Sequence, residues 1–158
     1  MNHLFLEALS LKHINRAGWL RVGIDAPESV AAHSWGVAWL VLNHAPKDID
    51  TLRALQLSLV HDVPEVVAGD ITPHDDVPKA EKHRLERRAA ESLFQKREWM
   101  LAIWEEYEAA QTKEALFVKE CDKLDMALQA IRYSNEHTID TTEFIVSAKA
   151  HIRTPALL

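Results

Sequence analysis

The most informative motif of the chain covers residues 61 to 70 and reads His61-Asp62-Val63-Pro64-Glu65-Val66-Val67-Ala68-Gly69-Asp70. It follows an apolar, helix-like segment, and Pro64 interrupts helical hydrogen bonding directly after the His-Asp pair. Adjacent residues inside a helix point about 100° apart, so an imidazole and a carboxylate reach one divalent ion most easily at a helix end. A His-Asp pair alone is weak evidence, because in most chains it is an accident of the surface.

Helical periodicity surrounds this stretch on both sides, and nothing alternates with period two for long enough to make a strand. The sequence therefore predicts an all-α, single-domain bundle of about six or seven helices over residues 1–158. Gly18 is expected in the loop after the first helix, and Leu52, Leu55, Leu59 and Val60 on the apolar side of the third. Helices are expected near residues 4–14, 27–43, 48–62, 79–95, 99–110, 114–134 and 143–151, with one turn at 65–68.

Composition limits the classes of function. The chain has 158 residues, of which 47% are hydrophobic and 27% charged, as in an ordinary globular domain. A net charge of -6, with no Lys/Arg run longer than a pair, argues against binding a nucleic-acid polymer. Its apolar runs are too short to span a membrane, and the N-terminal stretch with Glu7 indicates an amphipathic helix rather than a signal peptide. Cys121 is the only cysteine, so a cytoplasmic protein without an intrachain disulfide is expected.

Two further polar residues lie within otherwise apolar helical segments. His33 is close to Val30 and Trp35, and Asp122 follows Cys121. Each alone has a plain interpretation, as a hydrogen-bonded core histidine and as a residue on a helix flank. Burying an unpaired carboxylate would be costly, however, and a single metal ion shared with the His-Asp pair accounts for all of these residues.

The order of these residues resembles the H…HD…D signature of the HD-domain phosphohydrolase superfamily. The likeness is greater to its small 5′-deoxynucleotidase branch, and it covers most of the chain from Arg16 to about Ile131. Besides residues 61–70, the motifs that carry it are Arg16-Ala17-Gly18-Trp19, Pro27 to Ser34 (PESVAAHS), Ile71-Thr72-Pro73, Pro78 to His83 (PKAEKH), Trp104 to Glu108 (WEEYE) and Phe117 to Lys123 (FVKECDK).

The resemblance implies a bundle of the HD-domain type with one divalent metal ion. It assigns the metal ligands to His33, His61, Asp62 and Asp122. Cobalt, manganese or a similar transition metal is expected, with magnesium, zinc, nickel and iron as alternatives. Four protein ligands around a six-coordinate ion leave room for a phosphate oxygen and a water molecule.

Two acidic residues match the family's catalytic positions. Glu65 and Asp70 correspond to groups that orient the attacking water or move protons. Glu65 follows His61 by four residues, so a helical turn alone would also bring it near the ion. The plainer interpretations are a solvated loop acid for Glu65 and a turn residue or helix N-cap for Asp70. Which of the two carries out which proton transfer stays open.

Arg16 and Trp19 resemble the family's substrate-binding pair. A guanidinium can clamp a phosphate, and the indole can pack against the sugar and leave a 2′-hydroxyl without a partner. The chain departs from the family pattern, because Ala17-Gly18 separates two residues that are adjacent in other members. A core aromatic and a helix C-terminal cation are the alternatives.

The leading functional prediction is hydrolysis of deoxyribonucleoside 5′-monophosphates. One alternative is a deoxynucleoside triphosphate triphosphohydrolase, acting for example on dATP, which would need cations such as Lys79, Lys82 or Arg84 around the phosphate tail. His83 could also approach the phosphates. The other alternative is a non-catalytic nucleotide-binding HD protein. Cyclic-nucleotide phosphodiesterase activity fits less well, since the extra histidines that a second metal requires are not evident.

The expected partners are a small-molecule nucleotide and a second copy of the chain. The resemblance implies a homo-oligomer, with a dimer favoured, and no membrane or nucleic-acid polymer. Trp39, Trp99 and Trp104 are compatible with interface anchors and equally with an ordinary core.

Overall fold

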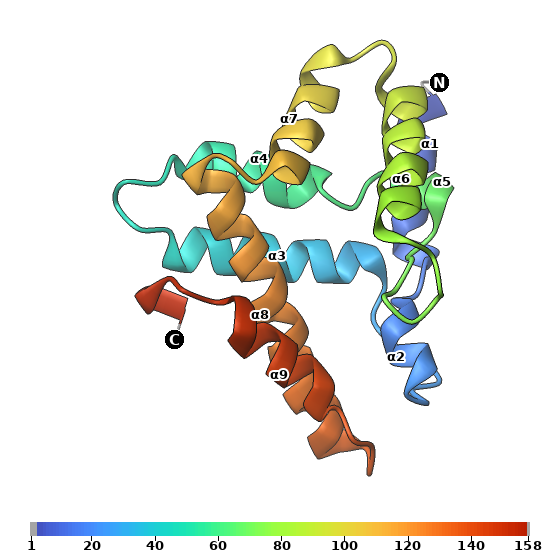
Figure 1. Ribbon diagram of the computed structural model, residues 1–158, viewed down its shortest axis with the longest axis vertical. Coiled ribbons are helices and arrows are strands. Elements are labelled where there is room, and N and C mark those ends of the chain that lie inside the picture. The colour runs from blue at the N-terminus through green and yellow to red at the C-terminus, as the bar shows by residue number, and fades with distance from the viewer. Residues whose placement is uncertain (1–2, 158) are drawn as a thin grey trace.

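The computed structural model describes residues 3–157, and within this range it contains helices and no strand (Figure 1). The all-α fold predicted from the sequence is confirmed. The bundle is built by α1 (His3–Leu9), α3 (Val30–His44), α4 (Thr51–Val60), α6 (Lys79–Phe94), α7 (Glu98–Ala109), α8 (Lys113–Glu136) and α9 (Thr142–His151). The shorter elements are η1 (Ser10–His13), α2 (Ala17–Arg21), α5 (Glu65–Ala68) and η2 (Pro155–Leu157).

Side-chain caps fix where the central helices begin. Ser29 accepts the backbone N–H of Ala32 at 3.1 Å, so α3 begins at Val30 rather than at Pro27, where the sequence predicts it. Asp50 caps α4 by accepting from Arg53 at 3.0 Å, and Thr112 caps α8 in the same manner. These caps set the register of the helices that carry the polar residues described below.

The segment after the first helix differs from the prediction. The sequence predicts a loop around Gly18, whereas residues Ala17–Arg21 form α2. The backbone N–H of Ala17 donates to the carboxylate of Asp70 at 2.7 Å, and Trp19 is buried beneath the helix. A cap contributed from 53 residues away does not appear in any local pattern.

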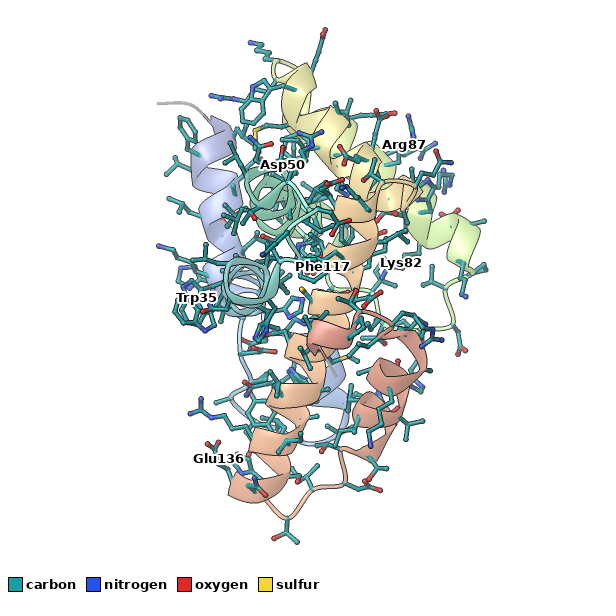
Figure 2. All side chains as sticks on the ribbon, turned by 90° about the vertical axis from the view of Figure 1, so that its left-hand side faces the viewer. Trp35, Asp50, Lys82, Arg87, Phe117 and Glu136 are labelled. Carbon is teal, nitrogen blue, oxygen red and sulfur yellow. The ribbon has the colours of Figure 1, made fainter. Side chains whose placement is uncertain are left out.

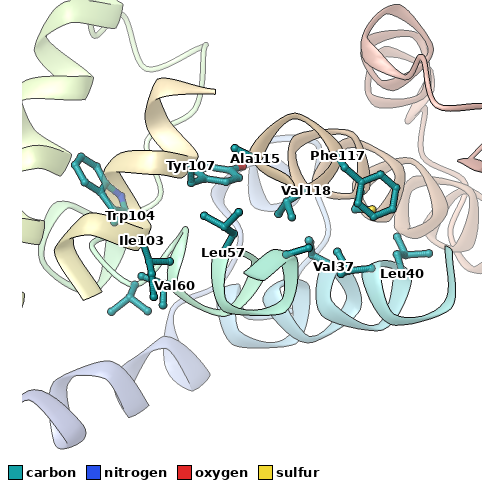
Figure 3. Close-up of a cluster of buried hydrophobic side chains, with 14 of the residues drawn as sticks. Val37, Leu40, Leu57, Val60, Ile103, Trp104, Tyr107, Ala115, Phe117 and Val118 are labelled. Atoms are coloured by element: carbon teal, nitrogen blue, oxygen red, sulfur yellow. The ribbon is translucent and has the colours of Figure 1, made fainter. Parts of the chain in front are cut away.

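The main core lies where α8 packs against α3, α4 and α7 (Figures 1 and 3). The side chains that fill it include Val37, Leu40, Leu57, Val60, Ile103, Trp104, Tyr107, Ala115, Phe117 and Val118. Of the predicted apolar side of α4, Val60 is buried in the core and Leu55 packs against it. Leu52 and Leu59 are exposed, because Ala54 and Leu57 face the core instead. Figure 2 shows Phe117 within the molecule and Trp35 at its edge.

A smaller apolar cluster holds α2 against the distal half of α8. It consists of Trp19, Ile24, Ala130 and Tyr133, with Phe144 of α9 packed against it. The sequence is compatible with either a core or an interface position for three tryptophans. In the structure Trp104 is buried, whereas Trp39 and Trp99 are exposed. No helix within residues 3–157 is long and apolar enough to cross a bilayer.

Candidate metal centre and substrate cavity

Three helices bring the four predicted metal ligands together. His33 lies in α3, His61 and Asp62 directly follow α4, and Asp122 lies near the middle of α8. The Nε2 atom of His33 is 3.1 Å from Oδ1 of Asp122 and 3.7 Å from Oδ2 of Asp62. The Nε2 atom of His61 is 3.2 Å from the same Asp62 oxygen. Residues distant in sequence therefore place two imidazoles and two carboxylates around one point.

The hydrogen bonding of the centre fits a divalent cation. Among residues 3–157, the buried side-chain atoms without a hydrogen-bond partner are Nε2 of His33, Nε2 of His61 and Oε2 of Glu65. Buried polar atoms are normally paired, so three orphans at one place indicate a missing partner. The Nδ1 atom of His61 donates to the carbonyl of Ser58 at 2.8 Å, which leaves its Nε2 lone pair free. Imidazole nitrogens with carboxylate oxygens suit a transition metal.

Without a cation, the positive charge of protonated His33 offsets the negative charges of the carboxylates around it. Burial lowers the pKa of His33, but the carboxylates of Asp122 and Asp125 outweigh burial and raise it to about 9. Burial raises the pKa of Asp62, yet His61 and His33 hold it below its ordinary range, and His33 does the same for Asp122. Because the carboxylates stay ionised, the centre attracts positive charge, and a metal ion binding there would displace the His33 proton.

Glu65 is a buried acid beside this centre. It is the first residue of α5, which begins after Pro64, and its side chain has only 6% of its surface exposed. Burial raises the pKa of Glu65 well above 4.5, and the charges of Asp62 and Asp70 raise it further. The alternative interpretation of Glu65 as a solvated acid in a loop is therefore wrong. A carboxyl group whose pKa is raised in this way holds a proton more readily than an exposed glutamate does, as a proton-transfer group requires.

Arg16 and Asp70 form a charged pair at the edge of the centre. The guanidinium Nη1 is 3.6 Å from Asp70 and 3.8 Å from Asp62. Burial lowers the pKa of Arg16, but these two carboxylates more than offset burial and raise it, so the side chain is a permanent cation. Asp70 also accepts the backbone N–H of Ala17 at the N-terminus of α2. It therefore caps α2, which precedes it in the chain, rather than α6, the helix that follows it.

Trp19 is both a core aromatic and part of a cavity wall. It is 2% exposed, and its indole N–H donates to Glu28 at 2.9 Å. Its ring packs against Tyr133 and Phe144, with centroid distances of 5.3 Å and 4.2 Å. Because α2 begins at Ala17, the two residues inserted after Arg16 form the first turn that directs this ring inward.

A cavity of about 610 Å³ opens beside the centre. Its volume lies within the range of small-molecule sites. Among the residues that line it are Arg16, Trp19, Asp62, Glu65, Asp122 and Phe144. Lys79, Lys82 and His83 also line the cavity, whereas Arg84 pairs with Glu81 on the exposed face of α6 and does not.

Two residues of the site had no role in the sequence interpretation. The hydroxyl of Tyr107 donates to Asp122 at 3.4 Å, and Nζ of Lys119 lies 3.8 Å from the centre of the Tyr107 ring. Both fall within quoted motifs, and Lys119 precedes Asp122 by three residues, hence on the same face of α8. The helical spacing was a usable signal for Lys119. Nothing local identified Tyr107, because its contact with Asp122 joins two helices.

The sequence of the chain is similar to those of known proteins. The chain is 40% identical over 142 residues to the 5′-deoxynucleotidase hdd1 of Schizosaccharomyces pombe. The aligned region covers 84% of this chain and 72% of that protein. It is 38% identical to the human 5′-deoxynucleotidase HDDC2, over 80% of this chain and 65% of the relative. The chain thus spans about two thirds of the length of these relatives.

Solved structures share the fold. A conserved hypothetical protein from Pyrococcus furiosus superposes with a TM-score of 0.81 at 34% identity, covering 91% of this chain and 85% of that one. A protein from Magnetospirillum magnetotacticum, described as a predicted metal-dependent phosphohydrolase, superposes with a TM-score of 0.68 at 30% identity. The superposition covers 80% of this chain and 67% of that one.

The family model described as an HD domain matches residues 8–157, nearly the whole chain. This range contains all four residues that converge between α3, α4 and α8. The match confirms the resemblance carried by the motifs, and the chain therefore belongs to the HD-domain family.

Proposed function

We propose that this protein is a metal-dependent phosphohydrolase that releases phosphate from deoxyribonucleoside 5′-monophosphates. One observation carries the proposal: the orphaned Nε2 atoms of His33 and His61 meet two ionised carboxylates beside a cavity that Arg16 also lines. The names of the relatives, 5′-deoxynucleotidases, supply the substrate. A cation and a guanidinium at one place suit a phosphate group.

The proposed metal ligands are His33, His61, Asp62 and Asp122, and the ion is cobalt, manganese or another divalent transition metal. When bound, such an ion polarises the phosphoryl group and lowers the pKa of a coordinated water molecule.

The protein's own residues then position the substrate and move protons. Arg16 binds the phosphate oxygens and offsets their charge. Ionised Glu65 takes the proton of the attacking water and, once protonated, donates it to the departing 5′-oxygen of the nucleoside. Asp70 holds the guanidinium of Arg16 and the start of α2. Of the two acids, we therefore assign proton transfer to Glu65 and positioning to Asp70.

The sugar specificity is proposed to come from the wall formed by Trp19 and Phe144. The indole N–H of Trp19 is already used by Glu28, and the rings present apolar surface. A 2′-hydroxyl placed against them would lose its hydrogen bonds to water without gaining a partner, which favours a deoxyribose.

A triphosphohydrolase is the second candidate, and the polar side chains that α6 contributes to the cavity favour it. Lys79, Lys82 and His83 line the same cavity as the metal centre. The amine of Lys82 is, however, held by the carbonyl of Ile71 at 2.7 Å and by Glu86 at 3.4 Å. These bonds reduce the charge available for a polyphosphate tail, so we favour the monophosphate.

One experiment separates these functions: product release from dNMP, NMP and dNTP substrates with Co²⁺ or Mn²⁺, with and without a chelator. We expect phosphate from dNMPs only, and none in the chelated control. Release of tripolyphosphate from dNTPs would establish the second candidate. No release from any substrate would leave the non-catalytic nucleotide-binding protein.

We also propose a homodimer in the cytoplasm. Trp35, Trp39 and Leu42 are exposed on successive turns of α3, and the two indoles stack with their centroids 6.0 Å apart. An exposed aromatic pair of this kind is typical of an interface anchor. The free, buried thiol of Cys121 is compatible with a reducing compartment.

A further inference from the structure

Asp125 contacts the nitrogen of His33 that faces away from the metal centre. It lies three residues after Asp122 on α8, and α8 packs against α3 (Figure 1). Its Oδ2 atom is 2.7 Å from Nδ1 of His33, while Nε2 of the same ring is directed at Asp122. The two carboxylates therefore hold opposite edges of one buried imidazole.

The position of the Asp125 carboxylate depends on Gly36. A Cβ atom at residue 36 would lie 2.0 Å from Oδ1 and 2.8 Å from Cγ of Asp125, far inside van der Waals contact. Gly36 lies in the interior of α3, where glycine is less favourable than alanine. Gly36 therefore makes α3 less stable than alanine would, but it leaves the space that the Asp125 carboxylate occupies.

We propose that Asp125 is a positioning residue for His33 and that Gly36 provides the space it needs. The hydrogen bond from Nδ1–H to Asp125 fixes the ring plane and the tautomer, so that the Nε2 lone pair points to the cation. Partners of this kind orient metal-bound histidines and raise their basicity. The inference rests on the proposed function only in taking His33 as a ligand.

A second cation bound by Glu28, His33 and Asp125 is the competing explanation. Ligand atoms of these three residues lie within 4.8 Å of one another. However, Nδ1 of His33 is already hydrogen-bonded to Asp125, and Oε1 of Glu28 accepts the indole N–H of Trp19. Both groups therefore have protein partners, and the positioning role accounts for the contact without a further ion.

The test is a Co²⁺ titration of the full chain and its variants, followed by the visible absorption of bound cobalt. We expect Asp125→Ala to weaken Co²⁺ binding by about 10- to 100-fold and to change the spectrum, because the ring no longer presents Nε2 in a fixed direction. Asp125→Asn keeps an oxygen that accepts from Nδ1–H, so its loss should be smaller. Asp48→Ala, at an exposed carboxylate, is the matched control and should bind as the wild type does.

Gly36→Ala tests the space requirement separately. We expect it to reproduce the affinity loss of Asp125→Ala, and the double variant to lose no more than either single variant. Gly36→Ala should also raise the melting temperature in the Asp125→Ala background, where the clash is gone and alanine favours the helix. Far-UV circular dichroism verifies that each variant is folded.

The outcomes are distinct. Co²⁺ binding by Asp125→Ala with wild-type affinity and spectrum overturns the inference and leaves the metal centre intact. Additive losses in the double variant overturn the link to Gly36. Two Co²⁺ ions per wild-type chain, falling to one in Asp125→Ala, would establish the second cation site instead. A wild-type chain that binds no Co²⁺ refutes the proposed function as well.

Discussion

The carboxylate of Asp70 accepts the backbone N–H of Ala17 at 2.7 Å through one oxygen and faces the guanidinium of Arg16 at 3.6 Å through the other. The Asp70 side chain thus fixes both the start of α2 and the guanidinium of Arg16 beside it. The contact joins the candidate metal centre to the cavity wall formed by Trp19 and Phe144, since Trp19 lies two residues after Ala17 in the same turn of α2.

Replacing Asp70 by alanine should therefore impair both stability and catalysis. Loss of the cap is expected to lower the free energy of unfolding by about 1–2 kcal/mol, measured by urea denaturation. The KM for a dNMP should rise as Arg16 loses its orientation. Asp70→Asn retains an oxygen acceptor for Ala17, so it should recover most of the stability and not the KM. Equal stability losses in the two variants would contradict the capping role.

Asp122→Ala should abolish turnover. The substitution removes a proposed ligand and the partner of His33 at 3.1 Å. We expect phosphate release from a dNMP with Co²⁺ to fall to the level of the chelated wild-type enzyme, while Asp48→Ala retains full activity. Near-wild-type turnover by Asp122→Ala would remove this residue from the ligand set.

Glu65→Gln should slow phosphate release by about 100-fold or more, since the proton carrier is lost. The same change should stabilise the metal-free protein at neutral pH. A raised pKa means that the folded state holds the Glu65 proton more tightly than the unfolded state, so stability falls as pH rises above 4.5. Glutamine has no proton to lose, and the variant should lack that decline.

Chemical denaturation from pH 4 to 9 measures this difference. His33 contributes a decline of its own, because its raised pKa gives stability that is present below 6.5 and lost as pH rises through about 9. That decline occurs in both proteins, so the difference between their curves isolates Glu65. Parallel curves across the acidic range would refute the burial argument.

Lys79→Ala distinguishes mono- from triphosphate chemistry. Lys79 lines the cavity, and a polyphosphate tail would need its charge. For the proposed monophosphatase, we expect kcat/KM on a dNMP to change less than about threefold. Arg84→Ala is the control, because Arg84 pairs with Glu81 outside the cavity, which corrects the expectation that it could serve the phosphates. A tenfold loss on the dNMP would contradict this assignment.

The exposed tryptophans of α3 predict the behaviour of the assembled protein. Trp39→Glu would place a charge in the proposed dimer interface, and we expect a shift from dimer to monomer in size-exclusion chromatography with light scattering. Trp99→Glu, at an equally exposed residue on α7, should leave the dimer unchanged. A wild-type monomer would refute the proposed homodimer.

Most of the helices and the His61-Asp62 pair follow from local information. Periodicity places α3, α4, α6, α7 and α8 nearly correctly, and the His-Asp pair before Pro64 identifies the centre because the proline must end the helix there. The convergence of His33 and Asp122 on that pair followed from the family resemblance rather than from spacing.

What local information misses depends on contacts between distant elements. The sequence does not show that Leu52 and Leu59 face solvent, because both faces of α4 carry leucine and only its packing against α3, α7 and α8 selects one. Likewise, α2 forms because Asp70 caps it and Trp19 is buried against α8 and α9. Neither cause lies within the segment itself.

The close approach of residue 36 to the Asp125 carboxylate has an evolutionary consequence. A Cβ at position 36 would lie 2.0 Å from Oδ1 of Asp125, so position 36 is restricted to glycine while the aspartate holds His33, whereas the glycine sets no steric limit on residue 125. Homologues that retain the aspartate should therefore also retain the glycine, whereas homologues without the aspartate can carry a larger residue at position 36, and an alignment of family members would show this one-way dependence.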